Sequence, residues 1–322
     1  MGEPISQATP QGPENLKIVI TGGAGLVGQN LTSKLLDSGC QHLHVLDKSS
    51  HNLAIAESLH PAVKFTEANL ADTGSWQDVF VGADVVVMLH AQIGGIVPEE
   101  FYRNNVTATE NVLAVVPKTA YLVHVSSSVV DSVADDDYCR SKAQQEQLVV
   151  DSGLPYIVLR PTLMFGWFDR KHLGWLSQFM SLSPIFPIPG HGNYIRQPLY
   201  VGDFCEIIIA AIRNRPPSEC FNISGKEKVG FIDILRMIKT ATKSWSLLLR
   251  IPYWLFYVLL KIYAVFDRDP PFTTTQLQAL VIDEVFEDID WEGIFGVKAT
   301  PLSQAIVDTF NHPRYSKIRL KF

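Results

Sequence analysis

A tyrosine and a lysine stand one helical turn apart at Tyr138 and Lys142, shortly after three consecutive serines at 126–128. Residues four apart share one face of a helix, so these two side chains can lie together. A free tyrosine has a pKa of about 10, and a nearby ammonium group favours its phenolate form. The pair therefore predicts acid–base chemistry, with a serine hydroxyl holding a substrate oxygen against the phenol.

A glycine-rich turn near the N-terminus predicts a binding site for a dinucleotide. An apolar run at 18–20 is followed by glycines at 22, 23, 25 and 28 and then by leucines at helical spacing. The unpaired N–H groups at a helix start attract phosphate, and glycine lets phosphate approach closely. We assign Gly22, Gly25 and Gly28 the turn, phosphate-approach and helix-packing roles of such a loop.

An acidic residue follows the next apolar run, at Asp47, 19 residues after Gly28. A carboxylate at the end of this strand would accept hydrogen bonds from the adenosine ribose hydroxyls. It would also repel a 2′-phosphate, so we expect NAD(H) rather than NADP(H). The neighbouring Lys48 weakens this preference, and NADP stays open as the alternative.

Strand and helix signals alternate through the first half of the chain. Apolar runs predict strands at 18–20, 44–46, 63–66, 85–89, 121–125 and 156–159, with helices between them. Repeated βα units predict an α/β fold, a Rossmann-type doubly wound parallel sheet that binds ligands at the carboxyl ends of its strands.

The domain boundaries follow from the same pattern. We expect a flexible tail at 1–14, an NAD-binding Rossmann domain at 15–165 and a smaller, mostly helical substrate-binding lobe at 166–322. Residues 196–215 are expected to return to the Rossmann sheet. A strand at 221–225 is expected to open the C-terminal part of the lobe.

Composition excludes several classes of protein. The net charge of −6 and the hydrophobic content of 47% indicate a globular chain that does not bind nucleic acid. The four cysteines lack C-x-x-C spacing, so we expect neither a metal site nor disulfides. Because the N-terminus lacks a signal-peptide pattern, the expected compartment is the cytoplasm.

Between about Leu16 and Ser224 the chain resembles the extended short-chain dehydrogenase/reductase family, in its nucleotide-sugar epimerase/dehydratase branch. The similar motifs are Thr21–Gly28, His90-Ala91, Asn105-Val106, Asn111-Val112, Leu159-Arg160-Pro161 with Gly166, Gly190-His191-Gly192, Arg196 and Tyr200-Val201-Gly202-Asp203. The resemblance implies a nucleotide-sugar substrate and a homodimer.

The resemblance also implies roles for individual residues. Ser128, Tyr138 and Lys142 would form the catalytic trio, with Ser128 preferred over Ser127. Lys142 would also hold the nicotinamide ribose, while Arg196 and Ser128 would contact the substrate. The implied cofactor site consists of Gly22, Gly25, Leu26, Val27, Gly28, Asp47, Asn69, Leu70, Ala91, Asn105, Ser126, Tyr138, Lys142 and Pro161.

Three departures from the branch bear on the reaction. Leu163 stands where an asparagine often contacts the substrate, and Asn69-Leu70 replaces an Asp-Leu pair that cradles adenine. The acid and base of the 4,6-dehydratases have no counterpart here, because Val129 occupies one of the two positions in either alignment. A valine transfers no proton, so dehydration is not expected.

The expected function is hydride transfer at a sugar carbon, C4, of a nucleotide-activated sugar. An epimerase and a 4-keto reductase share this apparatus, and the resemblance implies a role in O-antigen synthesis for either. One alternative is a 3β-hydroxysteroid-type dehydrogenase. Arg196 argues against it, because an arginine there indicates a phosphorylated substrate. Another is a cofactor-binding scaffold without turnover, which would not need both Tyr138 and Lys142.

Two late segments suggest contact with a membrane surface. Ile251–Phe266 is strongly apolar but shorter than the roughly 20 residues that span a bilayer. It predicts either a buried helix of the lobe or an interfacial helix. The C-terminal tail carries Arg314, Lys317, Arg319 and Lys321, which could meet anionic lipid at the inner face of the membrane or pair with acidic residues such as Glu284, Glu287 and Asp288.

Overall fold

The computed structural model describes residues 12–95, 97–131, 136–266, 281–287 and 289–321. Most of the tail expected at 1–14 therefore lies outside the described residues, as does Asp288. The last part of that tail differs from the expectation, because Pro13–Asn15 forms a short 3-10 helix in which Pro13 is buried.

Seven strands form one parallel sheet in the order β11-β6-β5-β4-β1-β2-β3. They are β1 (Lys17–Thr21), β2 (His42–Asp47), β3 (Lys64–Glu67), β4 (Val85–Met88), β5 (Tyr121–Val125), β6 (Tyr156–Pro161) and β11 (Glu219–Ile223). The predicted doubly wound α/β fold is confirmed. One expectation is wrong, because β11 pairs with β6 at the sheet edge instead of opening the lobe.

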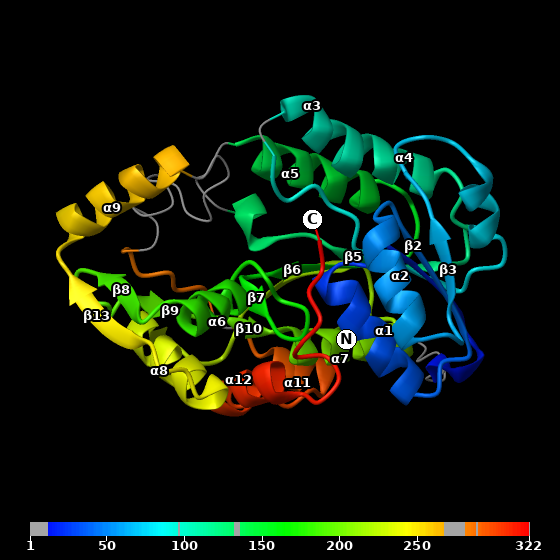
Figure 1. Ribbon diagram of the computed structural model, residues 1–322. Coiled ribbons are helices and arrows are strands. Elements are labelled where there is room, and N and C mark those ends of the chain that lie inside the picture. The colour runs from blue at the N-terminus through cyan, green and yellow to red at the C-terminus, as the bar shows by residue number, and fades with distance from the viewer. Residues whose placement is uncertain (1–11, 96, 132–135, 267–280, 288, 322) are drawn as a thin grey trace, which may run out of the picture.

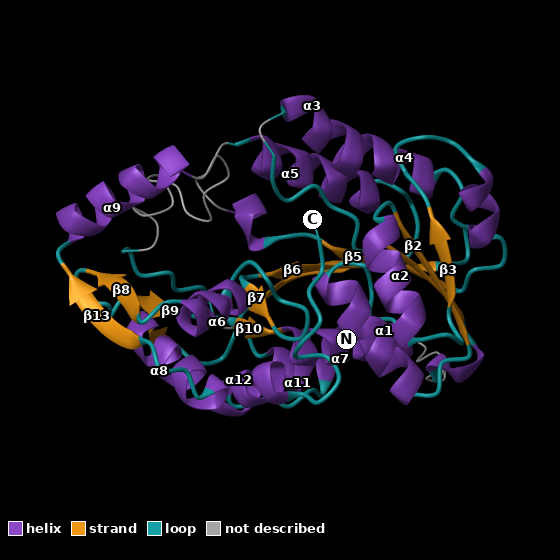
Figure 2. Ribbon diagram, viewed as in Figure 1, coloured by secondary structure: helices purple, strands orange, loops and turns teal. Residues whose placement is uncertain are grey.

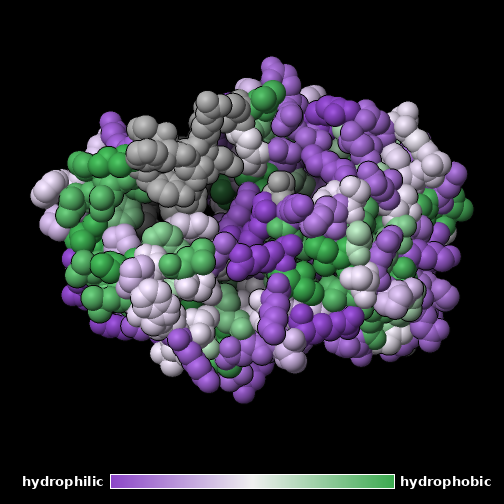
Figure 3. Space-filling model, viewed as in Figure 1, coloured by the Kyte–Doolittle hydropathy of each residue, from purple (hydrophilic) through white to green (hydrophobic). Residues whose placement is uncertain are grey.

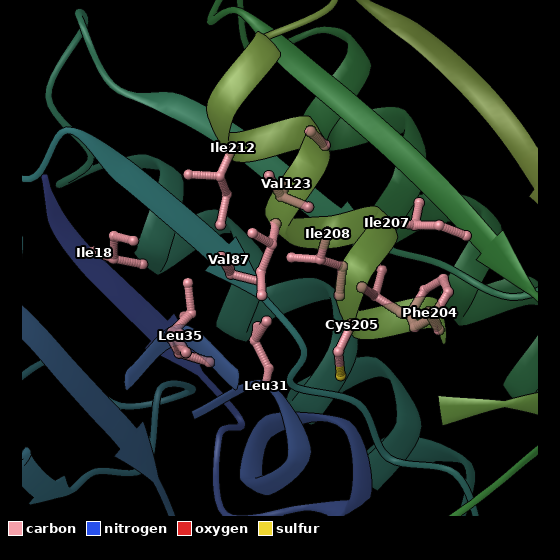
Figure 4. Packing of buried hydrophobic residues seen from close by; sticks show 14 of the residues in the cluster. Ile18, Leu31, Leu35, Val87, Val123, Phe204, Cys205, Ile207, Ile208 and Ile212 are labelled. Carbon is pink, nitrogen blue, oxygen red and sulfur yellow. The ribbon is translucent and has the colours of Figure 1, made fainter. Parts of the chain in front are cut away.

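Helices cover both faces of this sheet, because successive strand residues point to opposite sides (Figures 1 and 2). On one face Ile18 belongs to a core that also contains Leu31 and Phe204 (Figure 4), whereas its neighbour Val19 belongs to the core of the other face with Val112. The first face carries α1 (Leu26–Asp37), α2 (Ser50–Leu59), α7 (Val201–Asn214) and α11 (Trp291–Phe295). The second carries α3 (Pro98–Phe101), α4 (Ala108–Leu113) and α5 (Asp137–Val150).

A smaller lobe with its own core lies beside the sheet (Figure 1). Its helices are α6 (Leu173–Leu182), α8 (Phe231–Thr242), α9 (Tyr253–Phe266) and α12 (Leu302–Asn311). Its short strands pair as β7 (Met164–Phe165) with β10 (Leu199–Tyr200), β9 (Ile195–Arg196) with β12 (Val229–Gly230), and β8 (Ile185–Pro189) with β13 (Leu247–Ile251). Phe186 is buried in its core, and the partly buried Phe179 packs against it with ring centroids 5.3 Å apart, so these two aromatic side chains serve packing.

The C-terminal tail packs on the Rossmann domain. Tyr315 and Leu320 are buried against Leu59 of α2 and Phe168 of the lobe. The Lys321 N–H donates to Asn52 Oδ1 at 2.8 Å, and the Asn52 side chain donates back to the Lys321 carbonyl. The tail thus contacts both parts of the chain, although the sequence assigns it to the lobe.

Helix α9 lies at the outer edge of the lobe and is half covered. Trp254 is 66% exposed and Ile262 is 52% exposed, so α9 is not the buried helix that one alternative predicts. Within the part of the chain that the structure describes, no helix has both the length and the apolar character that crossing a membrane requires.

Candidate active site

The glycine turn between β1 and α1 has the geometry of an anion site. Gly22 has a φ of +67°, and a β-carbon there would lie 2.5 Å from the backbone of His90. A β-carbon on Gly28 would lie 2.3 Å from the Gly23 Cα, so Gly28 sets the packing of α1 on the turn. Gly25 has only the Gly22 carbonyl near its β-position, at 3.6 Å, and it precedes α1, which has no side-chain cap and no acidic residue in its first turn. The N–H groups at Leu26 and Val27 therefore remain available to an anion.

Asp47 ends β2 directly beside this turn. Its carboxylate accepts hydrogen bonds from the Ala24 N–H at 3.0 Å and from the Ser49 N–H at 2.9 Å. Burial raises the pKa of the Asp47 carboxyl group, and the Ser49 and Ala24 N–H groups oppose that shift. A carboxylate has about four acceptor positions, so Asp47 can still accept bonds from ribose hydroxyls. Lys48 reaches toward the loop after β4, where its ammonium group lies 3.3 Å from the Gln92 side-chain oxygen.

Asn105 fixes the loop after β4. It is fully buried in a π-helical segment, Tyr102–Thr107, between α3 and α4. Its oxygen accepts from the Gln92 N–H at 2.6 Å, and its amide donates to Ser141 of α5 at 2.9 Å. The expected cofactor residue Ala91 directly precedes Gln92, so Asn105 sets the backbone there.

The two residues expected near adenine follow β3. The Asn69 amide donates to Asp72 at 2.7 Å, and Leu70 is buried in the core of the second sheet face. They follow β3 at the carboxyl end of the sheet, and the Asn69 amide is already engaged by Asp72.

The serines at the end of β5 differ in what they contact. Ser127 is hydrogen-bonded to the Tyr138 hydroxyl, whereas Ser128 starts the 3-10 helix Ser128–Asp131. The structure therefore places Ser127 rather than Ser128 against the phenol. Ser126 is buried, and its hydroxyl has no hydrogen-bond partner. A buried hydroxyl without a partner is costly, and a bound ligand would satisfy it.

Lys142 is hydrogen-bonded to the end of β5 and to its own helix α5. Its Nζ donates to the Val125 carbonyl at 3.0 Å and to Gln145 Oε1 at 2.5 Å. Gln145 is fixed in turn by Thr109, whose hydroxyl lies 2.9 Å from its amide. This buried chain keeps Lys142 at the carboxyl end of β5.

Burial shifts the pKa values of both Tyr138 and Lys142, and the direction of the Tyr138 shift differs from the one expected from the sequence. Burial lowers the pKa of Lys142 to about 7. Burial also raises the pKa of Tyr138, and the Ser127 hydrogen bond opposes that shift. The expected lowering of the Tyr138 pKa by the Lys142 ammonium is wrong, because burial of the phenol dominates the shift and raises that pKa.

Arg160 braces the serine loop, a role that the sequence did not reveal. Its guanidinium group contacts Asp131 at 2.8 Å and Glu146 of α5, and the Asn222 amide donates to Asp131 at 3.2 Å. Pro161 ends β6 next to it and is buried. The Arg-Pro motif is visible in the sequence, but the two acidic partners stand 29 and 14 residues away.

Arg196 lines a pocket in the lobe with Leu163, Lys171, His172 and Glu284. Its guanidinium group donates to the Ile282 carbonyl at 2.7 Å and lies 3.9 Å from Glu284. Leu163 follows β6 by two residues, so this pocket adjoins the carboxyl edge of the sheet. Lys171 was missed in the sequence because it belongs to no spacing pattern. Among the described residues, no group of three or more His, Cys, Asp or Glu side chains could hold a metal ion.

Known proteins share this architecture. The chain is 28% identical to the low-salt glycan biosynthesis protein Agl12 of Haloferax volcanii over 247 residues, which cover 66% of this chain and 78% of that protein. It is 25% identical over 247 residues to a 4-hydroxy-2-methyl-3-oxo-4-farnesyl-3,4-dihydroquinoline-1-oxide ketoreductase of Stigmatella aurantiaca, covering 69% and 72% of the two chains.

A solved structure has the same fold. The crystal structure of UDP-glucuronic acid 4-epimerase from Bacillus cereus in complex with NAD superposes with a TM-score of 0.72 at 20% identity, covering 92% of this chain and 98% of that one. The model of the NAD dependent epimerase/dehydratase family matches residues 18–224, which include the glycine turn, Tyr138, Lys142 and Arg196. The chain belongs to this family of NAD dependent epimerases and dehydratases.

Proposed function

We propose that this protein catalyses NAD-dependent hydride transfer at C4 of a nucleotide-activated sugar. The observation that carries the proposal is the group formed by Ser127, Tyr138 and Lys142 at the carboxyl end of β5. This end of the sheet also carries the uncapped helix start at Gly25. Acid–base chemistry and dinucleotide binding therefore meet at one edge of the sheet.

The residues present fit a bound NAD. The free N–H groups at the start of α1 suit the pyrophosphate, and Asp47 suits the adenosine ribose. The hydroxyl of Ser126, which has no partner, and the ammonium group of Lys142 offer hydrogen bonds to the nicotinamide side. When bound, the nicotinamide accepts or supplies the hydride.

Tyr138 moves the proton in this proposal. Its raised pKa keeps the phenol protonated at neutral pH, so it can donate a proton to a ketone oxygen as that ketone is reduced. In the reverse direction the deprotonated phenolate accepts the proton of the sugar hydroxyl, and the raised pKa of Tyr138 makes that form scarce at neutral pH. Ser127 holds the same substrate oxygen against the phenol, a role for which the sequence favours Ser128.

The pocket in the lobe supports a nucleoside diphosphate as the substrate handle. Arg196 and Lys171 place two cationic side chains on one pocket, and cations paired with phosphate form strong hydrogen bonds. A steroid carries no such anion, which disfavours the 3β-hydroxysteroid-type alternative. Dehydration is disfavoured as well, because Asp131 of the serine loop is paired with Arg160.

Epimerisation and 4-keto reduction both follow from this site, and the product is expected to enter surface polysaccharide such as O-antigen. The similarity to a glycan biosynthesis protein supports that role. The test mixes purified protein with UDP-N-acetylhexosamines, UDP-glucuronic acid or a 4-keto-6-deoxy UDP-sugar, with NAD, NADH or NADPH. Products are identified by NMR.

An epimer formed without net consumption of NADH establishes the epimerase, and a 4-hydroxy product with stoichiometric NADH oxidation establishes the reductase. Arg196→Ala and Lys171→Ala should raise KM for the sugar nucleotide far more than they lower kcat. Turnover of a ketone without phosphate, unaffected by these two substitutions, would overturn the nucleotide-sugar assignment.

A further inference from the structure

An exposed apolar surface covers the end of the lobe. We define the apolar patch as Ile185, Leu247, Leu249, Trp254, Val258 and Ile262, which are between 42% and 66% exposed. Figure 3 shows apolar surface at this end of the molecule, where Figure 1 places α9, β13 and β8. Single exposed apolar residues are ordinary, but a group of this kind marks an interaction surface.

The backbone explains why these side chains share one surface. Leu247 pairs with Ile185 across the two parallel strands, and Leu249 lies two residues further along the same strand face. On α9, Trp254, Val258 and Ile262 are spaced four residues apart and form one stripe. That stripe faces solvent, so α9 has an apolar outer face where a surface helix normally carries polar residues.

The segment of sequence that supplies β13 and α9 is positively charged in an otherwise acidic protein. Residues 239–266 contain Lys239, Lys243, Arg250 and Lys261 but no Asp or Glu, although the whole chain has a net charge of −6. Residues 173–192, which supply α6 and β8, contain no Asp, Glu, Lys or Arg at all. The patch therefore combines exposed apolar side chains with a local excess of cations.

We propose that the apolar patch docks on the surface of a membrane that contains anionic lipid. Helix α9 has 14 residues and is about 21 Å long, short of the roughly 30 Å hydrocarbon core, so it lies along the interface. Trp254 suits the headgroup depth that tryptophan prefers, and the cations face the lipid phosphates. This docking does not depend on the catalytic assignment.

A second copy of the chain fits this surface less well. A symmetric contact brings the same patch of each copy together. The four cations of one copy would then face those of the other, and like charges across an interface oppose binding. The C-terminal tail is not part of the docking surface, because its apolar residues Tyr315 and Leu320 are buried against α2 and the lobe.

The test is flotation of the full chain with liposomes of phosphatidylcholine alone or mixed with phosphatidylglycerol, at low and high salt. We expect flotation with the anionic liposomes at low salt. The variant W254S/V258S/I262S should bind at least about tenfold more weakly, because the stripe inserts into the interface. The variant K243E/R250E should lose binding by about tenfold or more to anionic liposomes.

The matched control is V81S/I294S, which replaces apolar residues that are 72% and 50% exposed outside the patch. It should float like the unmodified chain, and circular dichroism should show that all variants are folded. Failure of the full chain to float with anionic liposomes at low salt overturns the proposal. Equal flotation of the stripe variant and the control also overturns it. So does an unmodified chain that binds no liposomes but forms a dimer, if only the stripe substitutions disrupt that dimer.

Discussion

Tyr138 and Lys142 share one helix, and burial favours the neutral form of both, so their pKa values shift in opposite directions. The phenol is held in its neutral form by a raised pKa, while the pKa of Lys142 falls to about 7. The two groups therefore respond to different ranges of pH. Their hydrogen bonds also differ, since Tyr138 contacts Ser127 and Lys142 contacts Val125 and Gln145.

This difference predicts the pH dependence of ketone reduction in a single turnover. Because the pKa of Lys142 is lowered to about 7, its positive charge is present below that pH and is lost as the pH rises through it. The reduction rate should therefore fall near pH 7. Tyr138, with its pKa raised from an ordinary value of about 10, should cause no loss at neutral pH. Lys142→Met should remove the change near pH 7, and a profile unaltered by that substitution would contradict the assignment.

The two serines offer a matched pair of variants. Ser127→Ala removes the hydroxyl that contacts Tyr138 and should lower kcat by about a hundredfold, as loss of one donor to a reacting oxygen does. Ser128→Ala should stay within a fewfold of the unmodified enzyme. Steady-state kinetics on the sugar nucleotide that the product assay identifies measures both effects. The opposite order of effects would return the role to Ser128.

Asp47 is expected to select NADH over NADPH. Asp47→Asn removes the charge that repels a 2′-phosphate, so the ratio of the NADPH and NADH Kd values should fall by about tenfold, or about 1.4 kcal/mol. Titrations of nicotinamide fluorescence measure both constants. Asp78→Asn, an exposed carboxylate outside the site, is the control for net charge. A Kd ratio unchanged by Asp47→Asn would contradict the role of this residue.

Some of these residues were predictable from the sequence and others were not. The glycines and Asp47 follow from local spacing, because each directly ends a strand or starts a helix. The choice between Ser127 and Ser128 was not predictable, since a shift of one residue beyond a strand reverses the side-chain direction. The lowered pKa of Lys142 depends on its burial in the folded protein, which no short motif reveals.

At the scale of elements, the C-terminal tail ties the two parts of the chain together. Leu320 is 1% exposed and packs with Leu59 and Phe168, while the Arg170 guanidinium group donates to the Leu320 carbonyl at 3.0 Å. Leu320→Ala should lower the free energy of unfolding by about 2 kcal/mol. Chemical denaturation measures this change.

The neighbouring Lys317→Ala is the control, because Lys317 is exposed and its loss should cost no more than about 0.5 kcal/mol. If the two variants are equally stable, the tail does not pack as described.

The strands of the main sheet were largely predictable because they are continuous apolar runs, and β5 matches its predicted range of 121–125. Strand β11 was predicted but misplaced, since its partner β6 lies more than 50 residues away in the sequence. The position of the tail was missed for the same reason. Its alternation of apolar and basic residues indicates one buried side but does not say which surface covers it.

At the scale of the whole molecule, the cofactor-binding residues and the apolar patch lie at different ends. Figure 1 places α2 and β3 at one end of the molecule and α9 with β13 at the other, with the carboxyl edge of the sheet and the Arg196 pocket between them. Docking through the apolar patch would leave the cofactor-binding end facing the aqueous phase. This arrangement suits an enzyme that hands a soluble nucleotide sugar to an acceptor at the membrane.

Single-turnover hydride transfer in the Tyr138→Phe variant tests the central claim most directly. The variant removes the transferable proton and little volume, so NADH affinity should stay within a fewfold of the unmodified protein. Hydride transfer between NADH and the sugar nucleotide, followed by nicotinamide fluorescence after rapid mixing, should slow by about 10²–10⁴-fold. Transfer at the unmodified rate by a variant that binds both NADH and sugar nucleotide would contradict the assignment of Tyr138 and the reaction built on it.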